Sequence, residues 1–203
     1  MFTIPAQNAR LHYLARLPLP LPTEVLLRRL IEELDWQARS IRMFGRSVLQ
    51  PRLIAWYADD GLSYRYSGED HTGAPLPAVL EQLRDCVERS SGHRFNSVLC
   101  NYYRDGSDSM GMHADDEPEL GAQPVIASLS LGQVRTLRFK HRCDREQSDI
   151  RVPLEDGSLL LMAGDTQRYW KHGIAKTRKP CGPRVNLTFR QIVTDLGHVR
   201  SGV

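Results

Sequence analysis

The sequence predicts a mainly β fold, of the β-sandwich or jelly-roll type, with two flanking helices. From Arg94 onward, short strand-like segments follow one another with turn residues between most of them, which is typical of such folds. In the first half of the chain, two segments carry apolar residues at helical spacing. The length of 203 residues, with 41% hydrophobic and 25% charged residues, fits one globular domain that buries its own core.

The first part of the chain, residues 1–22, is expected to be an irregular, extended arm. It ends in alternating leucines and prolines, and repeated prolines disfavour a helix. Thr23 is the expected N-cap of a first helix over residues 23–37. The apolar face of that helix is formed by Leu26, Leu27, Leu30, Ile31 and Leu34.

Short strand-like pieces are expected over residues 40–67, and a second helix follows them. Pro77 can begin this helix and Gly92 can end it, because proline suits the first helical turn and glycine suits the position past the last. The remainder is expected to form eight strands, at residues 95–103, 110–116, 124–131, 136–142, 150–154, 158–163, 167–172 and 184–193.

Three observations concern the cellular compartment of the protein. No apolar run approaches the roughly 18 residues that a transmembrane helix needs. The first residues lack a basic segment followed by an apolar stretch, so no signal peptide is expected. The four cysteines are scattered, without a Cys-x-x-Cys pair, which indicates reduced thiols in a cytoplasmic protein rather than disulfides or a structural zinc site.

The charge of the chain is mildly basic and unevenly distributed. The formal net charge of +3 identifies no partner by itself. Basic residues gather in two flanks, residues 10–52 and 135–151, and acidic residues gather between them, over residues 105–119. This distribution fits a nucleic-acid surface around a metal site, and it also fits an ordinary solvated surface.

A candidate metal centre is formed by His113, Asp115 and His172. His113 and Asp115 stand two positions apart, so on a strand their side chains would leave the same face. Two histidines and one carboxylate form the ligand set that holds non-haem Fe(II) with coordination positions left open. Taken alone, a His-x-Asp pair is a weak signal, and a chance pair on a loop explains it better than a metal site does.

The last strand carries two arginines that could bind an anion. Over residues 184–190 the sequence alternates strictly, with Arg184, Asn186, Thr188 and Arg190 on one face and apolar residues on the other. Arginine suits carboxylates because its fork can bind both oxygens, so two arginines would suit a dicarboxylate. The alternative is a surface strand with solvated arginines.

A second pair, Asn101 and Tyr103, stands two positions apart on an expected strand. It lies close enough in sequence to His113 to join the same pocket. Ordinary cross-strand packing is the alternative for both residues.

These residues together resemble the AlkB family of Fe(II)- and 2-oxoglutarate-dependent dioxygenases, which repair alkylated nucleic acids. The shared pattern is N-x-Y at Asn101–Tyr103, H-x-D at His113–Asp115, His172, and R-x-N-x-x-x-R at Arg184–Arg190. The resemblance runs from about Met43 to Val193, and it implies a double-stranded β-helix, or jelly-roll, core preceded by a nucleotide-recognition lid.

The resemblance also implies roles for individual residues. The Fe(II) ligands would be His113, Asp115 and His172, with O2 binding at the same ion. Arg184 would pair with the distal carboxylate of 2-oxoglutarate. The residues completing that co-substrate pocket would be Asn101, Tyr103, Asn186 and Arg190. Asp116 and Glu117 match positions that contact the damaged base, and their negative charge would favour cationic methylated bases.

Two segments of the first half resemble substrate-binding parts of the family. In Tyr64–Gly68, Tyr66 would stack on the extruded base, with Tyr64 on the same strand face and Ser67 beside it; core aromatics are the alternative. Met43–Arg46 resembles a hairpin that enters the base stack. There Phe44, followed by Gly45, would fill the gap that an extruded base leaves, and Arg46 would hold a phosphate, although a lone phenylalanine is also common in cores.

The function implied is oxidative demethylation of N1-methyladenine and N3-methylcytosine in single- or double-stranded DNA. Formaldehyde would be released, and 2-oxoglutarate would become succinate and CO2. RNA demethylation, protein hydroxylation and a non-enzymatic nucleic-acid-binding or oxygen-sensing role remain alternatives. A monomer without a membrane partner is expected. The chain would divide into an arm (1–22), helices and lid (23–93) and a dioxygenase core (94–203).

Overall fold

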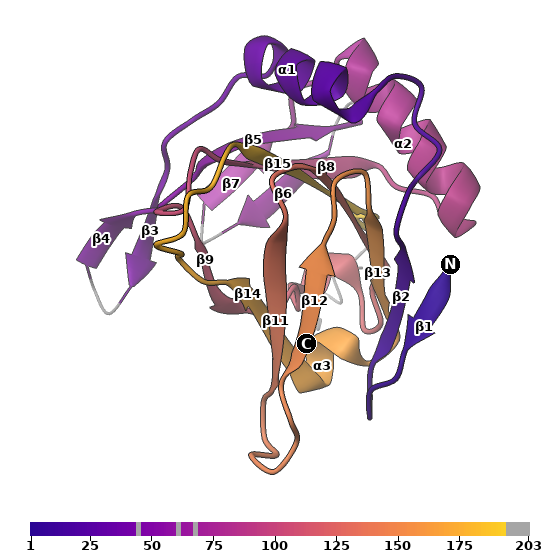
Figure 1. The fold of residues 1–203 in the computed structure, drawn as a ribbon, viewed down its shortest axis with the longest axis vertical. Coiled ribbons are helices and arrows are strands. Elements are labelled where there is room, and N and C mark those ends of the chain that lie inside the picture. The colour runs from indigo at the N-terminus through magenta and orange to yellow at the C-terminus, as the bar shows by residue number, and fades with distance from the viewer. Residues whose placement is uncertain (44–45, 60–61, 67–68, 194–203) are drawn as a thin grey trace, which may run out of the picture.

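The computed structural model describes residues 1–43, 46–59, 62–66 and 69–193. Two antiparallel sheets face each other, and two helices cover the outer side of the larger sheet (Figure 1). In spatial order, the larger sheet contains β1 (Phe2–Ile4), β2 (Arg10–Leu14), β13 (Leu159–Ala163), β10 (Ile126–Gly132), β15 (Arg184–Arg190), β8 (Ser97–Tyr103) and β5 (Leu53–Ala58). The smaller sheet contains β12 (Ile150–Leu154), β11 (Arg135–His141), β14 (Trp170–Ile174) and β9 (Met110–His113).

This architecture confirms the mainly β jelly roll with flanking helices. The covering helices are α1 (Thr23–Glu33) and α2 (Ala78–Ser91). Two small hairpins, β3 (Ser40–Met43) with β4 (Arg46–Leu49) and β6 (Ser63–Tyr66) with β7 (Glu69–Thr72), stand apart from both sheets. The short helices are η1 (Pro118–Leu120) and α3 (Thr166–Tyr169). None of the helices in the described ranges is long and apolar enough to cross a membrane.

The helix α1 differs from its prediction at both ends. Pro22, rather than Thr23, occupies the N-cap position, and the Thr23 hydroxyl donates to Asp156 Oδ2 at 2.6 Å instead of capping the helix. The helix ends four residues before the predicted end, because Leu34 is extended and the next backbone N–H, that of Asp35, donates to the Tyr57 hydroxyl. By contrast, α2 follows Pro77 and ends at Gly92, in the left-handed region (φ 74°), as predicted.

Three further expectations about local structure were wrong. The arm is not irregular throughout, because β1 pairs with β2 and β2 pairs with β13 at the edge of the larger sheet. The strand expected at 167–172 begins as α3, whose Thr166 hydroxyl accepts from the Arg10 backbone N–H and donates to the Ala163 carbonyl. The strand expected to reach residue 116 ends at His113.

The core has two layers, separated by the larger sheet. One layer lies between that sheet and the helices, and Leu187, Leu26 and Leu83 are all 0% exposed within it. The other lies between the two sheets and includes Phe139 and Trp170. Because β15 pairs with β10 on one side and with β8 on the other, it is a central strand, and both of its faces are covered.

A substitution of Phe189, on the helix-facing side of β15, tests the importance of this packing. Phe189 is 0% exposed, so Phe189→Ala is expected to lower the free energy of unfolding by about 3–5 kcal/mol through lost burial and a residual cavity. Phe2→Ala is the matched control, because Phe2 is 58% exposed, and its cost should stay within about 1 kcal/mol. Urea unfolding measures both; equal losses would contradict the packing described.

Candidate metal centre

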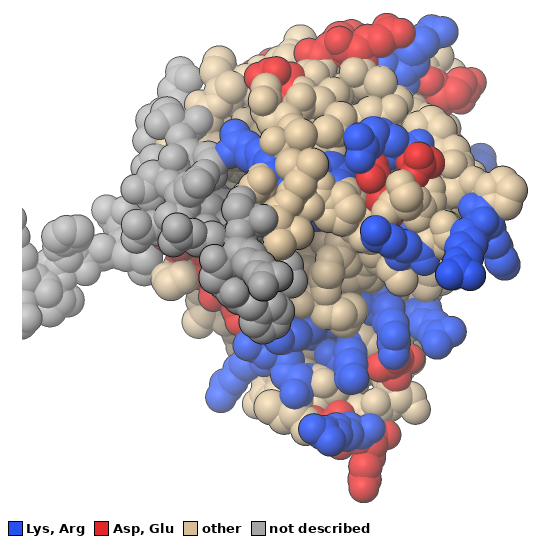
Figure 2. Space-filling view, turned by 90° about the vertical axis from the view of Figure 1, so that its left-hand side faces the viewer, with Lys and Arg blue, Asp and Glu red and all other residues tan. Residues whose placement is uncertain are grey.

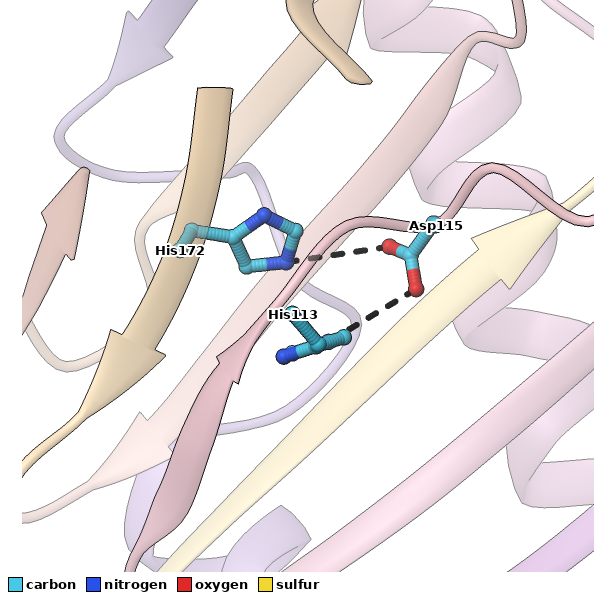
Figure 3. Close-up of side chains that lie close together, drawn as sticks. All are labelled: His113, Asp115 and His172. Atoms are coloured by element: carbon cyan, nitrogen blue, oxygen red, sulfur yellow. Dashed lines mark ion pairs between the residues drawn. The ribbon is translucent and has the colours of Figure 1, made fainter. Parts of the chain in front are cut away.

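Three side chains meet between the two sheets. His113 ends β9, and His172 lies directly opposite it on β14. Asp115 follows two residues after His113 and turns back towards both rings (Figure 3). The His113 Nε2 atom lies 3.7 Å from Asp115 Oδ1, and the His172 Nε2 atom lies 3.8 Å from Asp115 Oδ2. One ligand atom from each residue lies within 4.8 Å of the other two.

The path of the chain, rather than strand alternation, brings Asp115 to this position. The sequence predicted a shared strand face for His113 and Asp115, but β9 ends at His113 and Asp115 lies beyond it. The backbone N–H of Asp115 donates to Gln167 Oε1 at 3.0 Å, which ties the segment to α3. The three predicted residues therefore come together by a different local structure.

The His113 ring is oriented by its own strand. Its Nδ1 atom lies 3.0 Å from the Gly111 carbonyl oxygen. Because a carbonyl oxygen only accepts, Nδ1 carries the proton in this contact, and Nε2 keeps its lone pair towards Asp115 and His172. A histidine held in this way presents the nitrogen that a metal ion needs.

Burial and neighbouring charges set the protonation of the other two residues. Burial alone would raise the pKa of Asp115, but its electrostatic interactions with Arg190, His113 and His172 and its hydrogen bond with Arg190 lower it to about 2. Arg190 Nη2 donates to Asp115 Oδ1 at 2.9 Å. Burial, together with the charges of His113 and Arg190, lowers the pKa of His172 to about 3. At neutral pH the centre therefore offers a carboxylate and an uncharged His172 ring.

The donor set fits a divalent transition metal. Asp115 Oδ2 is buried and has no hydrogen-bond partner among the described residues, although an unpaired buried carboxylate oxygen is costly. An ion held by His113, Asp115 and His172 would satisfy that oxygen. Two imidazoles and one carboxylate suit Fe(II) and leave coordination positions for other ligands.

A buried cation lies in the same cavity. Arg184 is 1% exposed, and its Nη2 donates to Ser130 Oγ at 2.9 Å. Its Nε and Nη1 atoms have no hydrogen-bond partner in the described part of the chain. Burial lowers the pKa of Arg184, as is expected for a buried guanidinium that no carboxylate stabilises. An incoming carboxylate would supply both the charge and the acceptors.

The predicted face of β15 points into this cavity. Arg184, Asn186, Thr188 and Arg190 all line it, while the alternate residues pack against the helices. The polar lining consists of these four residues with Ser128, His113, Asp115 and His172. The apolar lining consists of Met110, Leu137, Leu154, Met162 and Ile174. The prediction that the arginines point inward is thereby confirmed.

The two predicted residues of β8 lie behind this lining. Tyr103 is 0% exposed, and its ring centre lies 5.0 Å from the Arg184 guanidinium carbon. Asn101 is opposite Asn186 in register, and its Oδ1 accepts from Arg52 Nε at 2.7 Å. Both residues therefore support the cavity wall, and neither lines the cavity itself.

The acidic pair after the metal motif lies at the outer side of the centre. Asp116 has a half-exposed side chain, and its Oδ2 accepts from Arg142 Nη1 at 2.6 Å. Glu117 is half-buried and directly precedes η1.

The predicted substrate-binding residues of the first half are only partly described. Phe44, Gly45 and Ser67 lie outside the described residues. Arg46 begins β4, and Tyr64 and Tyr66 lie on β6, but the described parts of these strands do not include their side chains. Their roles stay predictions.

Two members of the predicted basic flanks do not belong to the surface. Arg52 and Arg135 are each 5% exposed, so neither can hold a phosphate from outside. Arg52 bonds to Asn101, and Arg135 donates to the carbonyl oxygens of Asp105, Asp108 and Ala175. The sequence did not predict these contacts, because a charged residue gives no clear local signal of burial. A hint exists for Arg135, which begins a strand whose alternate residues Leu137 and Phe139 are apolar.

Comparison with known proteins agrees with this geometry. Residues 22–190 match the 2OG-Fe(II) oxygenase superfamily. The chain is 41% identical over 179 residues to the alpha-ketoglutarate-dependent dioxygenase alkB homolog 3 of Rattus norvegicus, covering 84% of this chain and 60% of the relative. It is 40% identical over 173 residues to the DNA oxidative demethylase ALKBH2 of Homo sapiens, covering 82% and 66%.

The mouse relative and a solved structure extend the comparison. The DNA oxidative demethylase ALKBH2 of Mus musculus is 38% identical over 177 residues, covering 83% of this chain and 74% of the relative. The structure of OsALKBH1 superposes with a TM-score of 0.65 at 18% identity, covers 93% of this chain and 98% of that one, and shows the shared fold. The chain spans about 60% of the length of the alkB homolog 3 proteins. The chain belongs to the AlkB family within the 2OG-Fe(II) oxygenase superfamily.

Proposed function

We propose that this protein removes methyl groups oxidatively from N1-methyladenine and N3-methylcytosine in DNA, releasing formaldehyde as 2-oxoglutarate becomes succinate and CO2. The observation that carries the proposal is that the His113–Asp115–His172 centre and the uncompensated Arg184 share one cavity. A metal ion and a carboxylate co-substrate would therefore be neighbours. Two relatives at about 40% identity are named DNA oxidative demethylases, which supports DNA as the substrate.

The metal ligands in this proposal are His113, Asp115 and His172. Bound Fe(II) supplies the activation of O2, with 2-oxoglutarate as the source of two electrons. Arg190 and Gln167 hold Asp115 by its carboxylate and its backbone N–H, and the Gly111 carbonyl holds the His113 ring. Such contacts keep ligand atoms in place before the ion arrives.

The co-substrate residues are Arg184, Asn186 and Arg190, with Tyr103 and Asn101 behind them. Arg184 would bind the distal carboxylate, because it lines the cavity that also contains the metal centre and its Nε and Nη1 have no hydrogen-bond partner among the described residues. Asn186 Nδ2 donates to Ser128 Oγ and to the Leu129 carbonyl oxygen, so its position is fixed by β10. Apolar residues such as Leu137 and Ile174 exclude water from the rest of the cavity.

The base would bind beside the acidic pair. Protonated or N-methylated cationic bases are attracted to carboxylates, and Asp116 and Glu117 follow the metal ligand Asp115 directly. Arg142 neutralises part of the charge of Asp116. Stacking by Tyr66, support by Tyr64 and Ser67, and insertion of Phe44 with Gly45 and Arg46 beside it remain predictions for the lid and the hairpin.

The outer surface of the smaller sheet offers a place for the phosphates. We call it the outer basic face and define it by Lys140, Arg151 and Lys171, which are all exposed. Lys140 and Lys171 are cross-strand neighbours on β11 and β14, and within the described ranges none of the three forms an ion pair. Figure 2, which shows the molecule from the left-hand side of Figure 1, shows Lys and Arg side chains, with some Asp and Glu among them, across the lower part of the view. Such a surface favours phosphate binding without sequence preference.

Several finer expectations remain part of the proposal. DNA is the proposed substrate, either single- or double-stranded, and RNA or a protein side chain would be the substrate if methylated DNA is not repaired. The protein is proposed to act as a monomer, with residues 23–93 contributing the lid and residues 94–203 the catalytic core.

Metal binding tests the centre directly. Asp115→Asn removes the carboxylate charge. Loss of an outer-shell contact weakens metal binding about 10–100-fold, and loss of this ligand is expected to weaken Fe(II) binding by more than that. Anaerobic equilibrium dialysis against Fe(II) measures the affinity. His93→Ala, an exposed histidine after α2, is the control and should bind Fe(II) as the wild type does. Equal affinity in Asp115→Asn and wild type would reject the site.

Repair of a defined oligonucleotide tests the reaction. With Fe(II), ascorbate and 2-oxoglutarate, the wild type is expected to convert one N1-methyladenine to adenine and to release formaldehyde. His113→Ala should lose all detectable conversion, because a ligand is missing. Mass spectrometry of the oligonucleotide, as single strand, duplex and RNA of the same sequence, gives the substrate preference. Binding of Fe(II) and 2-oxoglutarate without conversion of any DNA would refute DNA as the substrate.

The outer basic face is tested by salt dependence. Each phosphate contact contributes about 0.7–0.9 to the slope of log affinity against log salt concentration. Replacing Lys140 and Lys171 together by alanine should therefore lower the slope by about 1.4–1.8. Fluorescence anisotropy with labelled DNA measures it. Arg94→Ala is the control, because its side chain is 88% exposed beyond the end of α2, and its slope should equal that of the wild type. An unchanged slope in the double variant would show that DNA does not bind to the outer basic face.

A further inference from the structure

Another buried arginine, Arg135, lies behind the cavity. It is 5% exposed and begins β11, and the metal motif and the co-substrate pattern do not include it. Its guanidinium carbon lies 5.7 Å from the centre of the Tyr103 ring, and that of Arg184 lies 5.0 Å from the same ring centre. Both cations are therefore within cation–π range of one aromatic side chain.

The contacts of Arg135 fix two loops. Nη2 donates to the Asp108 carbonyl oxygen at 2.9 Å and to the Ala175 carbonyl oxygen at 2.7 Å. Nη1 donates to the Asp105 carbonyl oxygen at 3.2 Å. Asp105 and Asp108 belong to the loop after β8, and Ala175 begins the loop after β14. One side chain thus joins the strand that carries Tyr103 to the strand that carries His172.

The two loops also touch each other closely. Thr177 N–H donates to the Gly106 carbonyl oxygen at 2.8 Å, and a Cβ at position 106 would lie 2.5 Å from the Thr177 carbonyl oxygen. The loop after β8 is braced internally, because the Arg104 side chain forms two hydrogen bonds with the Asp108 carboxylate. Arg135 therefore binds to carbonyl groups that are already held in place.

The charge of Arg135 is not cancelled. Its hydrogen-bond acceptors in the described part of the chain are carbonyl oxygens and the Cys181 thiol, and no carboxylate is among them. The charge of Arg184 has no carboxylate partner there either. Two positive charges near one ring, away from bulk water, are little screened and favour an anion beside them.

We propose that Arg135 is a positioning residue for the co-substrate, which fixes Tyr103 beside Arg184 and makes the cavity select a 2-oxo acid with a second carboxylate. The proposal rests on the proposed use of 2-oxoglutarate. Arg135 lies outside the cavity lining, so it acts through Tyr103, the loops and its charge rather than by touching the co-substrate.

Direct binding to two 2-oxo acids tests this role. Anaerobic calorimetry on the Fe(II)-loaded full chain gives the dissociation constants of 2-oxoglutarate and of 2-oxopentanoate, which has the same chain length but no distal carboxylate. The measured quantity is the ratio of the two constants. Arg135→Gln is expected to lower the preference for 2-oxoglutarate about tenfold and to change the affinity for 2-oxopentanoate less than about twofold. A general loss of folding would weaken both ligands together, and that result would overturn the proposal.

Matched variants complete the experiment. Arg138→Gln is the same substitution three positions along β11, where the side chain is half-exposed and paired with Asp149, and it should keep the wild-type ratio. Arg135→Lys keeps the charge and should keep the ratio within about threefold, even if the Gln variant does not fold. A ratio that falls in Arg135→Lys, or that stays unchanged in a folded Arg135→Gln, would contradict the role of the charge.

Kinetics separate this proposal from the proposed function. Arg135→Gln should raise KM for 2-oxoglutarate about tenfold while KM for the methylated oligonucleotide and kcat stay within about twofold. A wild type that binds 2-oxoglutarate selectively but repairs no base would reject the proposed substrate and leave the role of Arg135 standing. A parallel rise in both KM values would overturn the role of Arg135 alone.

Discussion

Because successive side chains of a β-strand point to opposite faces, the central strand β15 has to satisfy two environments at once. Val185, Leu187 and Phe189 face the helices, and all three are 0% exposed. The residues between them face the metal centre. Pairing with β10 and β8 fixes the register on both sides, and a shift by one residue would bury the arginines among the helices and turn the leucine into the cavity. The register of β15 therefore sets both the packing of the core and the position of the cavity arginines.

The buried charged side chains differ in whether they have a partner of opposite charge. Asp115 and Arg190 compensate each other, since Arg190 donates to the carboxylate at 2.9 Å. Arg184 and Arg135 have no such carboxylate partner among the described residues. An uncompensated buried charge is costly, and a fold retains it where a ligand of opposite charge completes the site. Arg184 begins β15, and Arg190, which pairs with Asp115, ends it, so the uncompensated charge of Arg184 lies at the other end of this strand.

Patterns with a clear period allowed the best predictions from the sequence. The alternation at 184–190 correctly predicted which residues face the cavity, and Pro77 and Gly92 correctly bounded α2. The sequence also predicted that His113, Asp115 and His172 meet, but for Asp115 it assumed a strand that ends two residues earlier. Contacts made across the fold left little local signal, so the burial of Arg52 and the pairing of β2 with β13 could not be anticipated. For Arg135 the one hint was the apolar alternate residues Leu137 and Phe139 of the same strand.

The central place of β15 in the larger sheet affects how the chain can fold while it is being synthesised. Its neighbours β8 and β10 are made much earlier, and β2, which can pair with β1 at once, must wait for β13 before it joins the rest of the larger sheet. Contacts between residues so distant in sequence are slow to form, and the larger sheet has a gap at its centre until the last strand has emerged. A nascent chain that stops before residue 184 would leave the edges of β8 and β10 that face this gap unpaired. Completion of the catalytic cavity and protection of the chain from aggregation should therefore coincide in time.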